Sequence, residues 1–176
     1  MYTLKRGDLI FVRSSGFIGW GIRFLTQSEI NHVAIYHGDE KLIEAQLGKG
    51  VQYNTIDNYL NDKNNYKVYA GYVSSAITND MIEKAIAVAS NELNKPYDLF
   101  GQIGVLVKII VTSIGLGRVV QFYGKNIAQK TNAFWCSELV DYAYDNAGFK
   151  LTQVDQRYAT PQDLAISKFI TFANLD

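Results

Sequence analysis

The sequence predicts an α+β fold with a central antiparallel sheet, and three features lead to this prediction. Apolar runs of strand length are concentrated in residues 8–73. A short polar segment separates two of these runs, as in a hairpin. Apolar residues at helical spacing follow in residues 82–93 and 136–147. Because a chain of 176 residues with 48% hydrophobic content can bury one sizeable core, we expect residues 1–176 to form a single domain.

The first strand is predicted at residues 8–12, where the bulky run DLIFV follows a turn-prone Arg-Gly pair. Residues 51–53 and 66–73 are further strand candidates, and the second of these alternates Val and Tyr with polar or small residues. Between the first strand and the hairpin, residues 18–25 carry apolar side chains at helical spacing but also glycines. We expect a short, loosely formed helix there.

The hairpin is predicted in the segment HVAIYHGDEKLIEA, and its register decides which side chains share a face. A three-residue loop at 38–40 pairs His37 with Lys41. That register places Glu44 on the same face as His32, one diagonal step away, at a Cα separation of roughly 7–8 Å that long side chains can bridge. A two-residue loop would place the two side chains on opposite faces.

Two helices are expected in the second half of the chain. The first covers residues 80–95, since Pro96 cannot continue it. The second runs from about 134 to 147, with Gly148 at the position that often ends a helix in left-handed conformation. Cys136 then lies in the first turn of this helix and faces inward.

The composition excludes several classes of protein and site. The 17 basic and 17 acidic residues cancel, which gives no electrostatic reason to expect a nucleic-acid partner. One cysteine cannot form an intramolecular disulfide, and with two histidines it does not supply a zinc motif, so we expect neither metal nor cofactor. The start MYTLKRGDLIFV lacks the pattern of a secretory signal. We therefore expect a cytoplasmic or unexported chain, although release to the cell wall by another route stays open.

Cys136 is the candidate nucleophile. A thiol at a helix N-terminus, beside an imidazole, is favoured as the reactive thiolate. The first-turn N–H groups of Cys136 and Ser137 could hold the oxyanion of a tetrahedral intermediate. His32 is the candidate base, because Glu44 on its face could orient the ring, whereas His37 has no evident orienting partner.

Each of these residues also has a plain structural interpretation. From the helix pattern alone, Cys136 is more often a small buried hydrophobe than a nucleophile. His32 could be structural, and Glu44 alone would usually be a surface charge. Glu138 is expected to have a structural role, on a solvated helix face or in a salt bridge.

Five blocks in order carry a resemblance to a known family: GDLIFVR, NHVAIYHGDEKLIEA, KPYDLFG, FWCSELVDYAY and ATPQDLA. The chain resembles the permuted papain-like hydrolases of the YiiX/YebB type, a circularly permuted branch related to NlpC-type cell-wall peptidases and to lecithin retinol acyltransferases. The resemblance implies a papain-like core in which the nucleophile helix packs on the sheet. It also implies that the histidine and its orienting residue come from the sheet, while the cysteine comes from a later helix.

The resemblance assigns the base to His32, the nucleophile to Cys136 and the orienting residue to Glu44. It implies a cysteine hydrolase that cleaves an amide bond through an acyl-enzyme, with a peptide or murein fragment as the first candidate substrate. A lipid-like acyl substrate is the alternative, for an amidase, esterase or acyltransferase. A non-catalytic module that binds an acyl chain or peptide on the same fold is the rival from a different class.

The aromatic residues Tyr36, Tyr97 and Trp135 are candidates for substrate binding. Residues 99–120 are expected to form an apolar insert or lid, and residues 103–120 of this segment match none of the five blocks. We expect residues 103–120 to line a pocket or fill the core, and contact with a membrane is possible but less favoured. A membrane span is the least favoured, because glycines and Lys108 interrupt a segment of barely sufficient length.

Overall fold

The protein is built on one six-stranded sheet in the order β4-β3-β2-β1-β5-β6, in which every pair of neighbours is antiparallel. The structure is a computed structural model and describes residues 3–15, 30–99, 101 and 132–175. The strands are β1 Leu9–Ser14, β2 His32–Gly38, β3 Lys41–Gln46, β4 Gly50–Thr55, β5 Tyr66–Val73 and β6 Ile170–Asn174. The predicted helix at 18–25 and most of the predicted insert at 99–120 lie outside the described residues.

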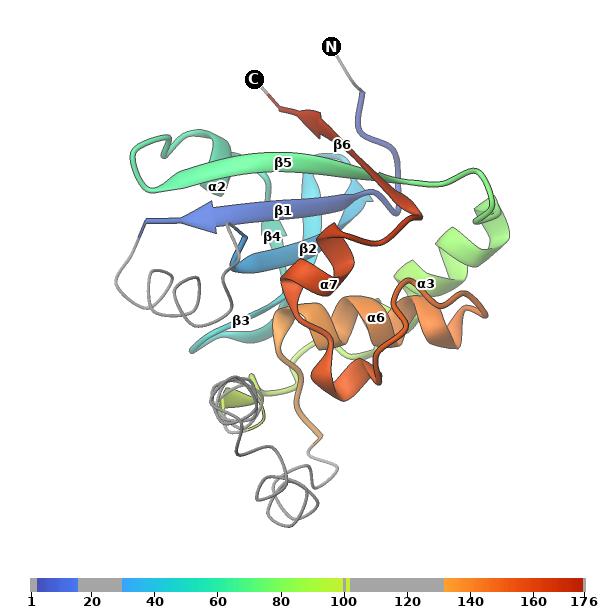
Figure 1. Cartoon of the computed structure of the whole chain (residues 1–176). Coiled ribbons are helices and arrows are strands. Elements are labelled where there is room, and N and C mark those ends of the chain that lie inside the picture. Colours follow the sequence, from blue (N-terminus) through green and yellow to red (C-terminus); the bar gives the residue numbers. More distant parts are fainter. Residues whose placement is uncertain (1–2, 16–29, 100, 102–131, 176) are drawn as a thin grey trace, which may run out of the picture.

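Figure 1 shows the longer helices together on one side of this sheet. The helices are α2 Asp57–Leu60, α3 Asn79–Asn91, α6 Cys136–Asn146 and α7 Pro161–Ala165, with a 3-10 turn η1 at Gln156–Tyr158. The main core lies between one sheet face and helices α3, α6 and α7. The short α2 helix contributes to a smaller cluster on the other face. The predicted α+β fold, with an antiparallel sheet and the Cys136 helix packed on it, is confirmed.

The turn of the β2–β3 hairpin differs from the predicted one. The paired residues are Ile35 with Ile43, Tyr36 with Leu42, and Gly38 with Lys41. The loop therefore has two residues, Asp39 and Glu40, both with positive φ, and the predicted pairing of His37 with Lys41 is wrong. A β-bulge between Tyr36 and Gly38 inserts one residue into β2. This extra residue compensates for the shorter loop, so His32 and Glu44 share a face as predicted.

Both long helices are shorter than the sequence pattern indicates. Helix α3 ends at Asn91 rather than at 95, because Asn94 takes a positive φ of 68° and the chain turns away before Pro96. Helix α6 begins at Cys136 rather than near 134, because the preceding residues are extended. It ends as predicted, with Gly148 at a positive φ of 94°.

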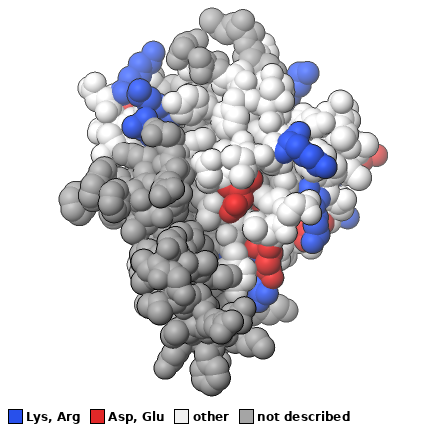
Figure 2. Space-filling model, viewed as in Figure 1, with Lys and Arg blue, Asp and Glu red and all other residues white. Residues whose placement is uncertain are grey.

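Two further features are the distribution of surface charge and the apolar character of the helices. In Figure 2 both basic and acidic side chains are spread over the visible described surface, and neither sign covers it. Within the part of the chain that the structure describes, no helix has the length and apolar character needed to cross a membrane.

Candidate active site

Helix α6 begins at Cys136 because the residues before it are extended and a neighbouring segment holds them in that conformation. Phe134 forms a parallel bridge with Tyr97, supported by a bond from the Phe134 N–H to the Pro96 carbonyl (3.2 Å). Trp135 is the N-cap, with φ −92° and ψ 174°. Cys136 is therefore the first helical residue, at the end of α6 where backbone N–H groups lack acceptors within the helix.

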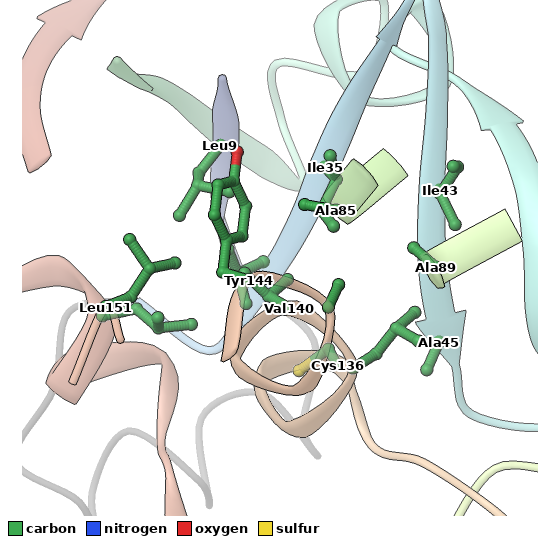
Figure 3. Close-up of a cluster of buried hydrophobic side chains, with 14 of the residues drawn as sticks. Leu9, Ile35, Ile43, Ala45, Ala85, Ala89, Cys136, Val140, Tyr144 and Leu151 are labelled. Atoms are coloured by element: carbon green, nitrogen blue, oxygen red, sulfur yellow. The ribbon is translucent and has the colours of Figure 1, made fainter. Parts of the chain in front are cut away.

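The apolar stripe of α6 seats this end of the helix in the core. Figure 3 shows Cys136, Val140 and Tyr144 along one side of α6, next to residues of the sheet and of α3. Val140 and Tyr144 are fully buried, and Cys136 is 2% exposed. Burial alone would fit the interpretation of Cys136 as a small hydrophobe. Its contact with an imidazole, described below, distinguishes it from one.

The first turn of α6 is also tied to the segment that precedes α7. The indole N–H of Trp135 donates to the Ser137 hydroxyl (3.1 Å) and to the Ala159 carbonyl (3.2 Å), and the Ser137 hydroxyl donates to the same carbonyl (2.7 Å). Trp135 is 5% exposed, so its ring is largely a structural anchor. None of these bonds uses the backbone N–H groups of Cys136 and Ser137. These groups belong to the first turn, where an N–H has no acceptor within the helix.

Glu138 has the expected structural role, but it is half-buried rather than on a solvated helix face. Its carboxylate accepts a hydrogen bond from the Trp135 backbone N–H, which is one half of a capping box. Burial raises the pKa of Glu138 to about 7, with that hydrogen bond acting in the opposite direction. The Oε2 atom is buried and has no hydrogen-bond partner among the residues that the structure describes. Glu138 therefore fixes the helix start while its own ionisation is disfavoured.

His32 and Glu44 meet across the hairpin. The His32 Nε2 atom lies 2.7 Å from Glu44 Oε2, and the Glu44 side chain is fully buried while that of His32 is 16% exposed. The bond engages Nε2 and leaves Nδ1 as the ring nitrogen for the Cys136 sulfur. The structure thus brings together the three residues that the sequence predicts as base, orienting residue and nucleophile.

The charges of this group support one another. Burial opposes a charge on the ring, but hydrogen bonds with Cys136 and Glu44, together with the charges of both groups, raise the pKa of His32 from 6.5 to about 10. Burial alone would raise the pKa of Glu44, yet the His32 charge and the hydrogen bonds that the carboxylate accepts hold it below its ordinary value. At neutral pH the pair is therefore an imidazolium and a carboxylate.

Three donors to Glu44 were not identified from the sequence. The Tyr59 hydroxyl donates to Oε2 (2.7 Å), while the side-chain amides of Asn54 (2.7 Å) and Gln52 (3.4 Å) donate to Oε1. The alternation of polar residues along β4 could have indicated the two amides, because Glu44 pairs with Gln52 in the β3–β4 register. Tyr59 had no such signal, since it reaches the site from the one-turn helix α2.

The remaining candidates lie at different distances from this group. Tyr97 is beside Phe134, next to the start of α6. Tyr36 is four residues along β2 from His32, roughly 13 Å in an extended strand, and its hydroxyl accepts a bond from the Glu40 N–H at the hairpin turn (3.3 Å). The structure does not bring Tyr36 to the cysteine. His37 is at the same turn, with its ring edge-on to Tyr53 (5.4 Å between centroids).

No group of three His, Cys, Asp or Glu side chains arranged to hold a metal ion occurs among the residues placed by the structure. Instead, the His32 ring on β2 is bonded to the Glu44 carboxylate on β3 and interacts with the Cys136 thiol at the start of α6. The three groups therefore lie in the order thiol, imidazole, carboxylate.

Comparison with known proteins identifies the family of this chain. Residues 3–102 match the sequence model of the family described as permuted papain-like amidase enzyme, YaeF/YiiX, C92 family. The probable lipoprotein peptidase YaeF of Escherichia coli strain K12 is 28% identical over 177 residues, which cover 92% of this chain and 62% of the relative. The chain thus spans less than two thirds of that relative's length.

A solved structure extends the likeness over nearly the whole chain. The crystal structure of metalloprotein yiiX from Escherichia coli O157:H7 superimposes with a TM-score of 0.67 at 17% identity, and 99% of each chain is covered. At this identity the likeness shows the fold. It confirms the permuted papain-like architecture.

Proposed function

The chain belongs to the family of permuted papain-like amidase enzymes, and we propose that it is a cysteine hydrolase that cleaves an amide bond in a peptide-type substrate. In this proposal Cys136 is the nucleophile, His32 the general acid and base, and Glu44 the residue that orients the ring. The observation that carries it is the His32 ring, bonded on one side to a buried carboxylate and in contact with the thiol on the other.

The first half of the reaction forms a thioester. A protonated imidazole stabilises a neighbouring thiolate, and the Cys136 sulfur attacks the amide carbonyl carbon. The carbonyl electrons move to oxygen, where the backbone N–H groups of Cys136 and Ser137 hold the charge. As the carbonyl re-forms, the C–N bond breaks, and His32 donates its proton to the leaving nitrogen.

The second half releases the acyl group. Neutral His32 accepts a proton from water as the water oxygen attacks the thioester carbonyl carbon. The C–S bond then breaks, and the thiolate and the imidazolium are restored. Throughout, Glu44 holds Nε2 so that Nδ1 faces the reacting atoms.

The substrate is proposed as a peptide or murein-type amide. Support comes from the family description and from the relative's printed name, a probable lipoprotein peptidase. Tyr97 lies beside Phe134, next to the start of α6, and is the proposed substrate contact, whereas the buried Trp135 ring is engaged by Ser137 and Ala159. A lipid-bearing substrate is the second candidate, because the sequence of residues 103–120 is strongly apolar.

The single cysteine makes the nucleophile directly testable. At pH 7 iodoacetamide should alkylate Cys136 faster than a model thiol, and His32→Ala should reduce the rate to that of the model thiol. His37→Ala is the matched control, since it removes the only other histidine, and it should leave the rate unchanged. Alkylation of the wild type at the model-thiol rate, unaffected by His32→Ala, would exclude the activated nucleophile and favour the binding module.

A substrate panel separates the two candidates. Purified protein is offered murein peptides, N-acylated peptides and lipid esters, with Cys136→Ala as the blank. Cleavage of the murein or plain peptides supports the first candidate, and cleavage restricted to the lipid-bearing compounds supports the second. Sedimentation with liposomes, with and without residues 103–120, tests the membrane interpretation, and no binding by either chain removes it.

A further inference from the structure

Glu44 is a fully buried carboxylate in which each oxygen has its own donors. His32 Nε2 and the Tyr59 hydroxyl both lie 2.7 Å from Oε2. The amides of Asn54 and Gln52 serve Oε1 at 2.7 and 3.4 Å. The carboxylate therefore cannot rotate without giving up bonds at both oxygens.

A buried carboxylate needs such donors to stay ionised, because transfer from water strongly penalises the charged form. His32 is the only cation bonded to Glu44 in the described part of the chain, and the remaining donors are neutral. The titratable groups around the carboxylate are His32 from β2, Tyr59 from α2 and, beyond them, Tyr66 from β5 and Cys136 from α6.

Tyr59 differs from the two amides because it is bonded to the same oxygen as His32. Its helix α2 is tethered to the hairpin turn by a bond from the Ile56 N–H to the Glu40 carbonyl (2.9 Å). Its ring packs against His32 (centroids 5.9 Å apart) and edge-on against Tyr66 (5.1 Å). With 4% exposure, the hydroxyl is held in place by packing on several sides.

We propose that Tyr59 is a positioning residue, whose hydroxyl fixes Glu44 Oε2 opposite His32 Nε2 and keeps the carboxylate ionised. This inference rests on the proposed function, because it describes how the proposed orienting residue is itself held. Tyr59 acts through Glu44 and is not a catalytic residue. The two amides at Oε1 prevent rotation of the group, while Tyr59 stabilises the charge on the atom that His32 uses.

Tyr59→Phe tests the hydroxyl alone, because the ring and its packing remain. Losing one donor raises the pH at which Glu44 takes up a proton, and His32 then loses its anionic partner. The acidic limb of the pH profile for Cys136 alkylation and for kcat should move upward by about one pH unit. We also expect kcat to fall about tenfold with KM within about twofold, as for the loss of one hydrogen bond to a charged group.

Tyr66→Phe is the matched control. It removes a hydroxyl from the ring that packs against Tyr59 but not a donor to Glu44, and it should leave the acidic limb and kcat unchanged. A thermal melt of each variant identifies a purely structural effect, because such an effect lowers Tm without moving the acidic limb of the pH profile. Both variants use the full chain.

The outcomes distinguish this inference from the proposed function. Wild-type alkylation with the profile of an ordinary thiol overturns both. An activated wild type whose acidic limb and kcat are unchanged by Tyr59→Phe overturns the role of Tyr59 alone. Equal shifts in Tyr59→Phe and Tyr66→Phe also overturn it, because the effect would then come from ring packing.

Discussion

At the scale of single residues, the properties of the site depend on a buried charge pair. Glu44 is ionised although it has no exposure, and His32 stays charged at pH values where an ordinary imidazole is neutral. The charge of His32 is the largest compensation for the burial of Glu44, whereas the burial of His32 is offset by its hydrogen bonds with Cys136 and Glu44 and by the charge of Glu44. Removal of either one should therefore change the protonation of its partner rather than only delete a contact.

Glu44→Gln keeps the shape of the side chain and removes its charge. His32 then keeps its hydrogen bond with Cys136 but loses the negative charge of Glu44, so we expect its pKa to fall below about 10. The basic limb of the activity profile should move to lower pH accordingly, since the acid that protonates the leaving group is lost earlier. NMR titration of the ring signals measures the shift.

His37→Gln provides the control for that titration. It leaves a single histidine signal, which assigns the resonance to His32, and it alters a ring at the far end of β2. An unchanged His32 titration in Glu44→Gln would show that the carboxylate does not set the charge of the ring.

Glu138 gives a second prediction for one residue, in the pH dependence of stability. Its pKa is raised on folding from 4.5 to about 7 by burial, so the folded state binds the proton more tightly than the unfolded chain. The free energy of unfolding should therefore decrease as pH rises from about 4.5 through 7. Glu138→Gln removes this loss. The change that the substitution makes in the free energy of unfolding should therefore be more favourable at pH 8 than at pH 5, by on the order of 2 kcal/mol.

Urea unfolding of wild type and variant at the two pH values measures this difference. Glu83→Gln is the control of opposite sign, because its hydrogen bond with Arg6 lowers the pKa of Glu83. The stabilisation by ionised Glu83 is present above the ordinary carboxyl pKa and is lost at lower pH. It is small, because the pair is exposed. A Glu138→Gln difference that is the same at both pH values contradicts the prediction.

The three residues of the candidate site were predicted from the sequence, but one of the reasons was wrong in detail. A three-residue loop was expected to place Glu44 on the face of His32, whereas a two-residue loop and a bulge give the same result in the structure. Helical spacing placed Cys136 in a first turn. Tyr59 could not be predicted, because its approach depends on where α2 packs. The partial burial of Glu138 could not be predicted, because helical spacing does not reveal that the rest of the molecule covers that side of the first turn.

At the scale of elements, the start of β4 is held by close backbone contact with the segment after α3. The Val51 N–H donates to the Lys95 carbonyl (2.8 Å), and the Asn94 N–H donates to the Val51 carbonyl (2.9 Å). These tertiary bonds explain why α3 ends before Pro96 although its apolar spacing continues. A local pattern cannot contain that information.

Two glycines near β4 allow this contact to be tested with a matched pair. Gly50 and Gly48 both have positive φ, 75° and 79°. A Cβ at Gly50 would lie 2.3 Å from the Lys95 carbonyl oxygen, whereas one at Gly48 would meet nothing within 4 Å. We expect Gly48→Ala to cost about 1 kcal/mol from backbone strain, and Gly50→Ala about 3 kcal/mol or more, since overpacking adds to the strain.

Chemical denaturation of both variants measures the difference. Equal costs would mean that the segment after α3 can move away from β4 without loss. A greater cost at Gly50 would show that this backbone contact resists displacement.

At the scale of the whole molecule, the main core is assembled from both ends of the chain. Sheet residues Leu9, Val33 and Ile43 pack in one cluster with Leu139 and Leu164 of the later helices. Strand β6, near the C-terminus, pairs with β5. The order of strands and helices predicted the fold class, but only the assembled structure shows how completely the early sheet depends on the late helices.

We propose that residues 1–176 fold as a single unit, and truncation tests this. A chain of residues 1–99 would lack α6, α7 and β6, which uncovers the apolar face of the sheet and exposes the edge of β5. We expect this fragment to show no cooperative thermal transition by circular dichroism, unlike the full chain. Addition of a peptide covering 132–176 should restore part of the signal, because it supplies the missing half of the core. A cooperative melt of 1–99 alone would instead identify the sheet as an independent domain, to which the nucleophile helix is docked.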